Sequence, residues 1–331
     1  MELYGQNWAA REWKMRVGRM AQIAGITRYE LQNGFERGVE MLEVRSGSGL
    51  RFGVCPSRGL DITFAEHNGR AIAWQSATGW RHPAYYNEDN LGWLRGFGGG
   101  LLTTCGFGSF GPPCEDDEEK YGIHDRASYL PAENVRVTEN WDDGELIIEG
   151  AVRQTRVFGP NLLLSRRIAV NIGTNQIRVH DELCNEGFVP VPAVVLYHCN
   201  FGFPVVSEHS VVEVPSQTAH ERDGKSGDWR TLEVPQPDYS ERVYFHDVNG
   251  EATVRASIRN PQLDFGAYIE FDSAQLPHFT QWKMMGAGDY VCGLEPSNAP
   301  LATRATLKER GELPILEAGE TRSFDLELGI L

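Results

Sequence analysis

The sequence predicts an all-β protein, a large antiparallel β-sandwich that occupies a single domain, residues 1–331. Short runs of alternating apolar and polar residues follow one another from about residue 133 onward, and a period of two is typical of half-buried strands. Turns rich in glycine, asparagine and proline separate these runs. Neither a fixed-period repeat nor a low-complexity linker divides the chain, so one sandwich is expected rather than two domains.

The first part of the chain is expected to combine an N-terminal extension with a β-hairpin. Residues 1–27 form the extension, and Trp13, Val17 and Met20 lie near helical spacing within it, which predicts one short helix. Predicted strands follow at residues 40–45, 50–56 and 71–75, and a turn at 47–49 joins the first two into a hairpin.

A long structured loop is expected at residues 79–122, where glycines alternate with many aromatic side chains. Such loops are often functional in β-proteins. Aromatic residues there could stack on sugar rings or fix the loop to the core, and we expect residues 96–114 to lie beside a cleft. The acidic run at 115–119 is predicted to be a solvated loop tip. Residues 106–111 have the form Gly-x-Gly-x-x-Gly, but prolines follow where a nucleotide-binding helix should begin. This segment is therefore not expected to bind a nucleotide.

The remaining strands are predicted at residues 145–155, 162–170, 176–183, 189–196, 211–214, 253–259, 265–271 and 323–328. The run at 189–196 is apolar and β-branched and leads towards a glycine- and proline-containing turn. His198 is therefore predicted at a strand end, where a rigid element can aim a polar group into a cavity.

Charge and cysteine content narrow the class of protein. The net charge is −15 and the pI about 5.1, which argues against nucleic acid and anionic membranes as partners. Six dispersed cysteines without a Cys-x-x-Cys pair argue against a zinc ribbon. The N-terminus lacks the layout of a signal peptide, and no apolar run reaches the roughly 20 residues of a membrane span. We expect a cytoplasmic protein with reduced thiols.

His198 and Glu295 are the predicted catalytic residues. Histidine titrates near neutrality and can donate or accept a proton there. Glu295 follows Val291, Cys292 and Leu294, and such apolar surroundings raise the pKa of a carboxylate and make it a better base. A carboxylate beside His198 would hold a proton on the imidazole. The alternatives are a hydrogen-bonded core histidine and an exposed glutamate at a strand end.

Five further residues are expected to bind substrate. Arg58 lies at a predicted turn, where its guanidinium could hold hydroxyls or a carboxylate, or simply pair with Asp61. His124 closes the glycine-rich segment ahead of Arg126. The complete predicted set is Arg58, His124, Arg126, Trp282 and Lys283.

Two histidines and a glutamate suit proton transfer at hydroxyl and ring oxygens without any cofactor. The same three side chains could instead bind Zn²⁺ or Fe²⁺. No two of them lie at close ligand spacing, and no serine or cysteine nucleophile motif is present. We therefore expect neither a metal nor a cofactor.

Five segments resemble the aldose 1-epimerase-like proteins of the galactose mutarotase-like superfamily, and among these most closely the DUF4432 branch. They are Arg-Gly-Leu-Asp-Ile at 58–62, Gly-Ile-His at 122–124, Leu-Tyr-His-Cys-Asn-Phe-Gly-Phe-Pro at 196–204, Cys-Gly-Leu-Glu-Pro at 292–296 and Leu-Glu-Ala-Gly-Glu-Thr at 316–321. The resemblance runs from about residue 28 to the end of the sequence.

The resemblance implies a β-supersandwich with a sugar-binding cleft on one sheet. It implies His198 as the general acid on the ring oxygen, Glu295 as the general base on the anomeric hydroxyl, and His124 and Arg58 as sugar-binding groups. The sequence departs from the family at Asp125, where relatives carry glycine.

The family has one more aspartate between the acid and the base. No motif aligns it here, and the candidates are Asp223, Asp228 and Asp238.

The sequence thus predicts a mutarotase-type isomerase that interconverts the anomers of a free sugar. The alternatives are a non-catalytic carbohydrate-binding or sensing protein and a metal-dependent sugar isomerase. The expected partner is a small-molecule carbohydrate, with a homodimer as the expected assembly.

Overall fold

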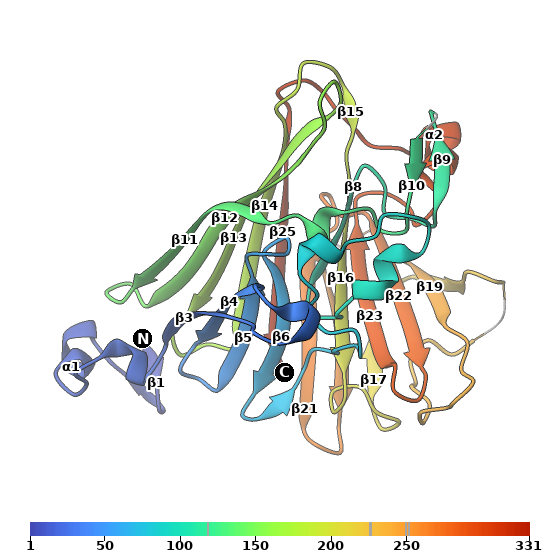
Figure 1. Ribbon diagram of the computed structural model, residues 1–331. Helices are drawn as coiled ribbons and strands as arrows, with labels where there is room; N and C mark the ends of the chain where they lie inside the picture. Colours follow the sequence, from blue (N-terminus) through green and yellow to red (C-terminus); the bar gives the residue numbers. More distant parts are fainter. Residues whose placement is uncertain (118, 225–226, 249, 251) are drawn as a thin grey trace.

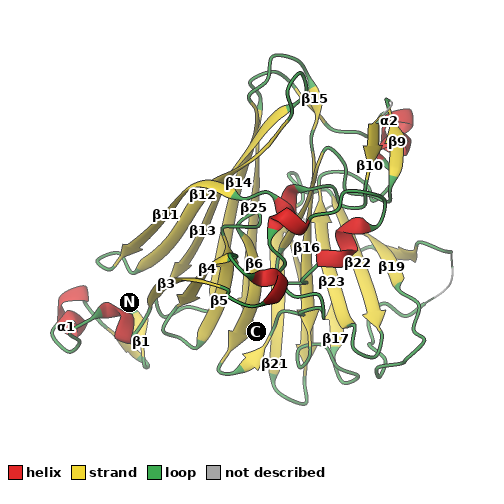
Figure 2. Ribbon diagram, viewed as in Figure 1, coloured by secondary structure: helices red, strands yellow, loops and turns green. Residues whose placement is uncertain are grey.

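The computed structural model describes residues 1–117, 119–224, 227–248, 250 and 252–331. Strands dominate it and every strand pair within its sheets is antiparallel, so the all-β prediction is confirmed (Figure 2). No helix among these residues is long and apolar enough to cross a membrane.

The largest sheet has eight strands in the order β11-β12-β13-β14-β25-β21-β20-β17. Their bounds are β11 Ala132–Asn140, β12 Glu145–Thr155, β13 Asn161–Asn171, β14 Gln176–Asn185, β25 Thr321–Ile330, β21 Phe265–Asp272, β20 Thr253–Asn260 and β17 Val211–Glu213. The alternation seen in the sequence places Ile177 and Val179 of β14 in the core, each 1–2% exposed, and burying each such side chain contributes about 1.5–3 kcal/mol.

Two further sheets complete the sandwich. The six-stranded sheet has the order β18-β19-β22-β23-β16-β8 and the five-stranded sheet runs from β3 to β7 in sequence order. Their bounds are β18 Thr218–Glu221, β19 Arg242–Asp247, β22 His278–Met285, β23 Tyr290–Ser297, β16 Val194–Gly202 and β8 Thr103–Phe107, then β3 Gly25–Glu30, β4 Glu40–Arg45, β5 Leu50–Cys55, β6 Asp61–His67 and β7 Arg70–Ala71. Ile62 and Leu102 exchange both backbone hydrogen bonds, which links β6 to the start of β8.

Short elements lie at the edges of these sheets (Figure 1). The strand pairs are β1 Glu2–Leu3 with β2 Gln6–Asn7, β9 Cys114–Asp116 with β10 Glu119–Tyr121, and β15 Val191–Pro192 with β24 Ile315–Leu316. The α-helices are α1 Ala10–Lys14 and α2 Arg304–Arg310, and the 3₁₀ turns are Met20–Gln22, Gly34–Glu36, Pro83–Tyr85, Gly92–Gly96 and Ala127–Tyr129. A short helix, α1, does lie in the N-terminal extension, but of the three residues that predicted it only Trp13 belongs to α1, because the helix ends at Lys14 and Met20 begins a separate 3₁₀ turn.

Most predicted strands match the structure to within two residues at each end, but the apolar run at 189–196 does not. It is divided between β15 and β16, and β16 continues to Gly202. His198 thus lies inside a central strand and not at a strand end, because β16 is bonded to β23 on one side and to β8 on the other. The strand predicted at 71–75 is also shorter, with isolated bridges at Ala73 and Gln75 beyond β7.

One buried guanidinium ties all three sheets together. Arg166 of β13 donates to both carboxylate oxygens of Asp181 on β14, at 2.9 and 2.7 Å, and to Asp61 of β6 at 3.2 Å. The Tyr197 hydroxyl of β16 donates to the same Asp181 carboxylate at 2.7 Å. These side chains are at most 2% exposed, so each charge depends on its partners.

Asp181→Ala is expected to destabilise the protein by about 3–5 kcal/mol, because it leaves the Arg166 charge buried with an incomplete partner set. Urea denaturation measures the change. Asp142→Ala is the matched control, since Asp142 pairs with Lys14 at 2.6 Å but its side chain is 80% exposed, and its loss should cost under about 1 kcal/mol. Equal effects of the two substitutions would contradict this account of the network.

Candidate active site

The register of two central strands brings His198 and Glu295 together. Cys199 of β16 pairs with Leu294 of β23 in an antiparallel register, so the preceding His198 faces the following Glu295 across the two strands. On the outer strands, Thr103 pairs with His198 and Thr280 pairs with Glu295. These four side chains form a row across one face of the six-stranded sheet.

His198 and Glu295 are close, buried and incompletely bonded. His198 Nε2 lies 3.4 Å from Glu295 Oε1, and the two residues are 5% and 3% exposed. His198 Nδ1 and Glu295 Oε1 have no hydrogen-bond partner among the described residues. Buried polar atoms usually have partners, so these two are available to a ligand.

Three members of this row, His198, Glu295 and Thr280, form the floor of a cavity of about 390 Å³. The lining residues are mainly apolar and aromatic, with a few polar groups, which is the composition expected of a small-molecule site. They are Leu91, Trp93, Leu94, Phe97, Gly111, Pro112, Ile123, His124, His198, Arg222, Glu241, Val243, Thr280, Trp282, Glu295 and Leu301. Of the seven predicted site residues, four line this cavity: His124, His198, Trp282 and Glu295.

Aromatic rings enclose the two histidines. The His198 ring centroid lies 5.2 Å from that of Phe97, 5.4 Å from that of Trp282 and 5.5 Å from that of His124. His124 is also 4.7 Å from Trp93. His124 Nδ1 is a third buried polar atom without a partner among the described residues.

Burial governs the charge states at this site. It raises the pKa of Glu295 well above the usual value, and the carboxylate of Glu241 raises it further. Burial, followed by the neighbouring His124, lowers the pKa of His198 well below the usual value. Burial therefore favours a protonated Glu295 beside a neutral His198, which differs from the expected imidazolium. The free-energy cost of burying the histidine charge outweighs the attraction of a neighbouring carboxylate that is itself protonated.

Two residues at the cavity mouth were missed by the sequence analysis. Glu241 accepts a hydrogen bond from Trp282 Nε1 at 2.9 Å and another from Arg222 at 3.1 Å. Among the described carboxylates that lie between His198 and Glu295 in the sequence, Glu241 is the one that lines the cavity. The alternation of Val243 and Phe245 just after it could have predicted strand β19, but the position of Glu241 beside the cavity depends on how β19 pairs with β22.

None of the three aspartates considered for this position lines the cavity. Asp223 lies 3.6 Å from Arg222, and Asp228 accepts hydrogen bonds from Arg230 and Thr231.

Arg58 does not line the cavity, although it supports the wall. Its guanidinium donates to the carbonyls of Ser128 and Gly96, both at 3.0 Å, and lies 3.9 Å from the centroid of the Tyr129 ring. The residue is 1% exposed. The alternative pairing with Asp61 is replaced by the bond between Asp61 and Arg166.

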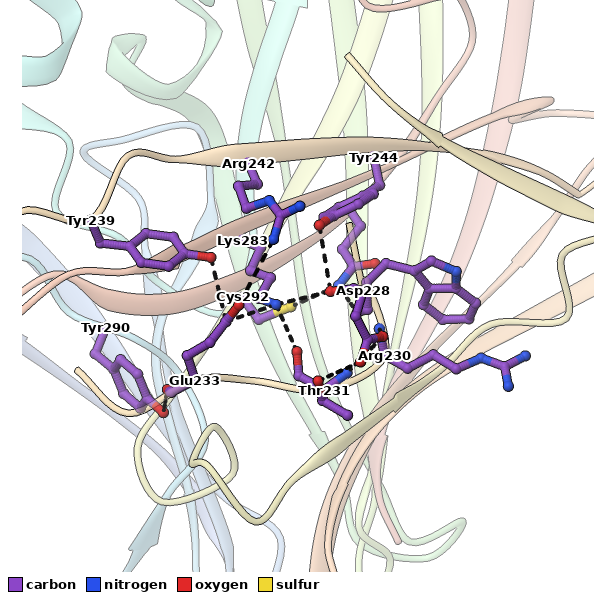
Figure 3. Close-up of polar contacts among 12 residues, drawn as sticks. Asp228, Arg230, Thr231, Glu233, Tyr239, Arg242, Tyr244, Lys283, Tyr290 and Cys292 are labelled. Carbon is purple, nitrogen blue, oxygen red and sulfur yellow. Dashed lines mark hydrogen bonds and ion pairs between the residues drawn. The ribbon is translucent and has the colours of Figure 1, made fainter. Parts of the chain in front are cut away.

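Lys283 points away from the cavity, because adjacent residues of a strand face opposite sides of a sheet and Trp282 faces the cavity. Its buried Nζ donates to the carbonyls of Asp228 and Thr231, at 3.0 and 2.7 Å, and pairs with Glu233 at 2.7 Å (Figure 3). Lys283 therefore fastens the segment at 228–233 to the sheet, and it is not among the residues that line the cavity.

Arg126 also lies outside the cavity lining. It pairs with Glu88 at 2.7 Å, and its side chain is 41% exposed. The adjacent Asp125 carboxylate is 3.6 Å away.

The glycine-rich segment does lie beside the cavity, as predicted, because Phe97, Gly111 and Pro112 line it. A side chain at Gly111 would place its Cβ 1.8 Å from the Ala302 carbonyl oxygen, so only glycine permits this contact with the chain ahead of α2. Phe110 packs in the aromatic cluster that includes Trp93, whereas Phe107 lies in the main core.

The acidic run is only partly the predicted solvated tip. Asp116 is bonded to Arg304 and Lys308 of α2, at 2.9 and 3.0 Å, and its side chain is 8% exposed. Asp117 is 74% exposed at its side chain. Glu118 lies outside the described residues. Within those residues, no group of three or more histidines, cysteines and carboxylates is arranged to hold a metal ion.

Comparisons with known proteins give one family and several related folds. The family model "Domain of unknown function (DUF4432)" matches residues 36–330. A Klebsiella pneumoniae structure described as a candidate aldose 1-epimerase has a TM-score of 0.86 and 27% identity, over 92% of this chain and 83% of that one. No curated protein matches the sequence.

Two more distant structures share the fold. A galactose mutarotase-like protein from Clostridium acetobutylicum has a TM-score of 0.63 and 14% identity, over 94% of this chain and 99% of that one. Galactose 1-epimerase from Lactobacillus acidophilus has a TM-score of 0.59 and 11% identity, over 93% and 99%.

The His124 ring is expected to make unfolding pH-dependent. Burial lowers its pKa from 6.5 to about 4, so the unfolded chain binds the extra proton first as pH falls. The resulting stability is complete above pH 6.5 and is lost progressively between pH 6.5 and 4. Allowing for solvent that reaches the ring from the cavity, His124 should contribute about 1–2 kcal/mol of the change between pH 7 and 5.

Urea denaturation of the wild type and His124→Gln at both pH values measures this contribution together with the smaller effect of His124 on the pKa of His198. The raised pKa of Glu295 acts in the opposite direction in both proteins and cancels in the comparison. Identical pH dependence in the two proteins would show that His124 titrates normally.

Proposed function

Because this chain belongs to the DUF4432 family and carries a buried His–Glu pair on the floor of a small cavity, we propose that it is a mutarotase-type isomerase. It interconverts the anomers of a free sugar, with His198 and Glu295 as its acid–base pair. The similarity to the Klebsiella pneumoniae protein supports a carbohydrate as the ligand.

The observation that carries the proposal is the pair itself. Anomerisation needs one group to remove the proton of the C1 hydroxyl and another to protonate the ring oxygen. These oxygens are bonded to the same carbon, so the two catalytic groups must be close together. His198 Nε2 and Glu295 Oε1 are 3.4 Å apart, and both residues line the cavity.

The active form is the pair with a single proton. In the roles implied by the resemblance, His198 protonates the ring oxygen and Glu295 takes the hydroxyl proton, which requires the shared proton on the imidazole. Burial instead favours that proton on Glu295. The two arrangements contain the same number of protons, and the polar sugar, as it enters, stabilises the charged one.

The reaction then proceeds without a covalent intermediate. As the bond between C1 and the ring oxygen breaks, Glu295 accepts the hydroxyl proton and His198 donates its proton to the ring oxygen. The C1–C2 bond of the open-chain aldehyde rotates, and the reverse transfers close the ring on the other face of C1. His124, Trp282 and Glu241 line the same cavity and hold the sugar in place.

A non-catalytic sugar-binding protein is the second candidate, favoured by the aromatic walls formed by Trp93, Phe97 and Trp282. Such a protein would bind sugar without changing the rate at which the anomers interconvert. The difference is measurable by NMR, since the anomeric protons of the two forms are resolved.

Glu295→Gln is expected to lower the rate of anomerisation by about 10²-fold or more while sugar binding persists, because the amide keeps the shape but cannot act as the base. NMR exchange measurements on a panel of free sugars give the rate. Glu270→Gln is the control, since Glu270 pairs with Arg255 on the eight-stranded sheet outside the cavity lining. Unchanged turnover in Glu295→Gln would remove Glu295 from the mechanism.

Chelation of metal ions is expected to leave the wild-type activity intact. Loss of that activity on chelation would favour a metal-dependent isomerase.

The pH–rate curve of the wild type is expected to be bell-shaped. At low pH the pair gains a second proton and has no base, and burial places this limb below the usual pKa of histidine. At high pH the pair loses its only proton and has no acid, and burial places this limb above the usual pKa of glutamate. His198→Asn should anomerise sugar slowly at every pH. Its pH–rate curve should lack the high-pH limb, because that limb reflects loss of the acid, which this variant has already lost. A wild-type profile in this variant would show that His198 is purely structural.

A further inference from the structure

The turn that carries His124 has an uncommon backbone. His124 and the following Asp125 both have positive φ, 60° and 52°. Residues with side chains rarely adopt this left-handed conformation, and two in succession require support from their surroundings. Aspartate tolerates the conformation better than most residues do, but tolerance alone does not fix the direction of the His124 ring.

The carboxylate of Asp125 supplies that support. Its Oδ2 accepts a hydrogen bond from the Gly108 backbone N–H and another from the Gln154 side-chain amide, both at 3.1 Å. The carboxylate is 8% exposed, so these bonds are protected from water. Gln154 belongs to β12 of the eight-stranded sheet, which makes its amide a fixed point.

Two hydrogen bonds to backbone carbonyls hold the same turn from other directions. The Gly106 N–H donates to the His124 carbonyl at 3.0 Å, and the Tyr86 hydroxyl donates to the Asp125 carbonyl at 3.1 Å. The turn is thus bonded to the chain on both sides of Phe107, just ahead of the wall residues Gly111 and Pro112.

We propose that Asp125 is a positioning residue, which holds the left-handed turn so that the His124 ring packs edge-to-face against the His198 ring beside the cavity. Asp125 itself does not line the cavity, so it acts on a bound sugar only through His124. The kinetic part of this inference rests on the proposed function, whereas the structural part does not.

Three substitutions separate the two properties of Asp125, its hydrogen-bond acceptor oxygen and its tolerance of positive φ. Asp125→Asn keeps an acceptor oxygen and tolerates positive φ, and the new amide nitrogen would face Arg126, which remains paired with Glu88. Asp125→Gly keeps the conformational freedom but loses the acceptor. Asp125→Ala loses both. If the carboxylate positions His124, the asparagine variant should retain the wild-type position of the ring and the other two should not.

The first readout is the NMR spectrum of the His124 imidazole, assigned by its loss in His124→Gln. We expect wild-type cross-peaks in Asp125→Asn and shifted cross-peaks in Asp125→Gly and Asp125→Ala. The second readout is kinetic. Asp125→Gly should raise KM roughly tenfold, the equivalent of one lost hydrogen bond, and leave kcat little changed, because His124 contributes binding and not the chemical step.

Asp264 provides the matched control. It also has a left-handed backbone, with φ of 44°, but it is exposed in the turn between β20 and β21 and does not line the cavity. Asp264→Gly and Asp264→Ala make the same backbone changes and should leave both readouts at wild-type values.

Wild-type cross-peaks and KM in Asp125→Gly would overturn the proposal, as would equal effects of the Asp125 and Asp264 substitutions. If Asp125→Ala does not fold, Asp125→Gly still decides. If the wild type anomerises no sugar, the proposed function fails, while the imidazole spectra still test the role of Asp125.

Discussion

The guanidinium of Arg166 fixes the relation between the sheets on which the cavity depends. It reaches Asp61, Asp181 and, through Asp181, the hydroxyl of Tyr197, so one buried charge connects strands of all three sheets. Tyr197 points into the sandwich because its hydroxyl is bonded there. The next residue along the strand must point the other way, and that residue is His198. Strand β16 therefore contributes Tyr197 to the interior of the sandwich and His198 to the cavity on the opposite face.

The six-stranded sheet is buried on both sides, for different reasons. One face packs on the apolar core. The other face carries the cavity and is covered by the glycine-rich segment. This explains why β16 is buried along its whole length. Adjacent residues of β22 show the same division, since Trp282 borders the cavity while Lys283 is held among carbonyl oxygens on the reverse face. A register shift of one residue would exchange these two environments.

The sequence was informative where a pattern is local. Alternation predicted the long strands, and the motifs around His198 and Glu295 identified two residues that the register does place together. It was less informative about arginine and lysine. Arg58 and Lys283 have the functional groups of a binding site, but their carbonyl partners come from distant parts of the chain and carry no sequence signature. The same limit applied to Glu241, whose position depends on how β19 pairs with β22.

The order of strands in the eight-stranded sheet has a consequence for how the protein is made. β25, residues Thr321–Ile330, lies between β14 and β21 in the middle of the sheet. Until a ribosome has synthesised this strand, β14 and β21 each have an unpaired edge, and exposed edges favour association with other chains. The nascent protein must therefore keep two half-sheets apart from other strands until residues 321–330 have emerged, which makes folding dependent on contacts of long sequence separation.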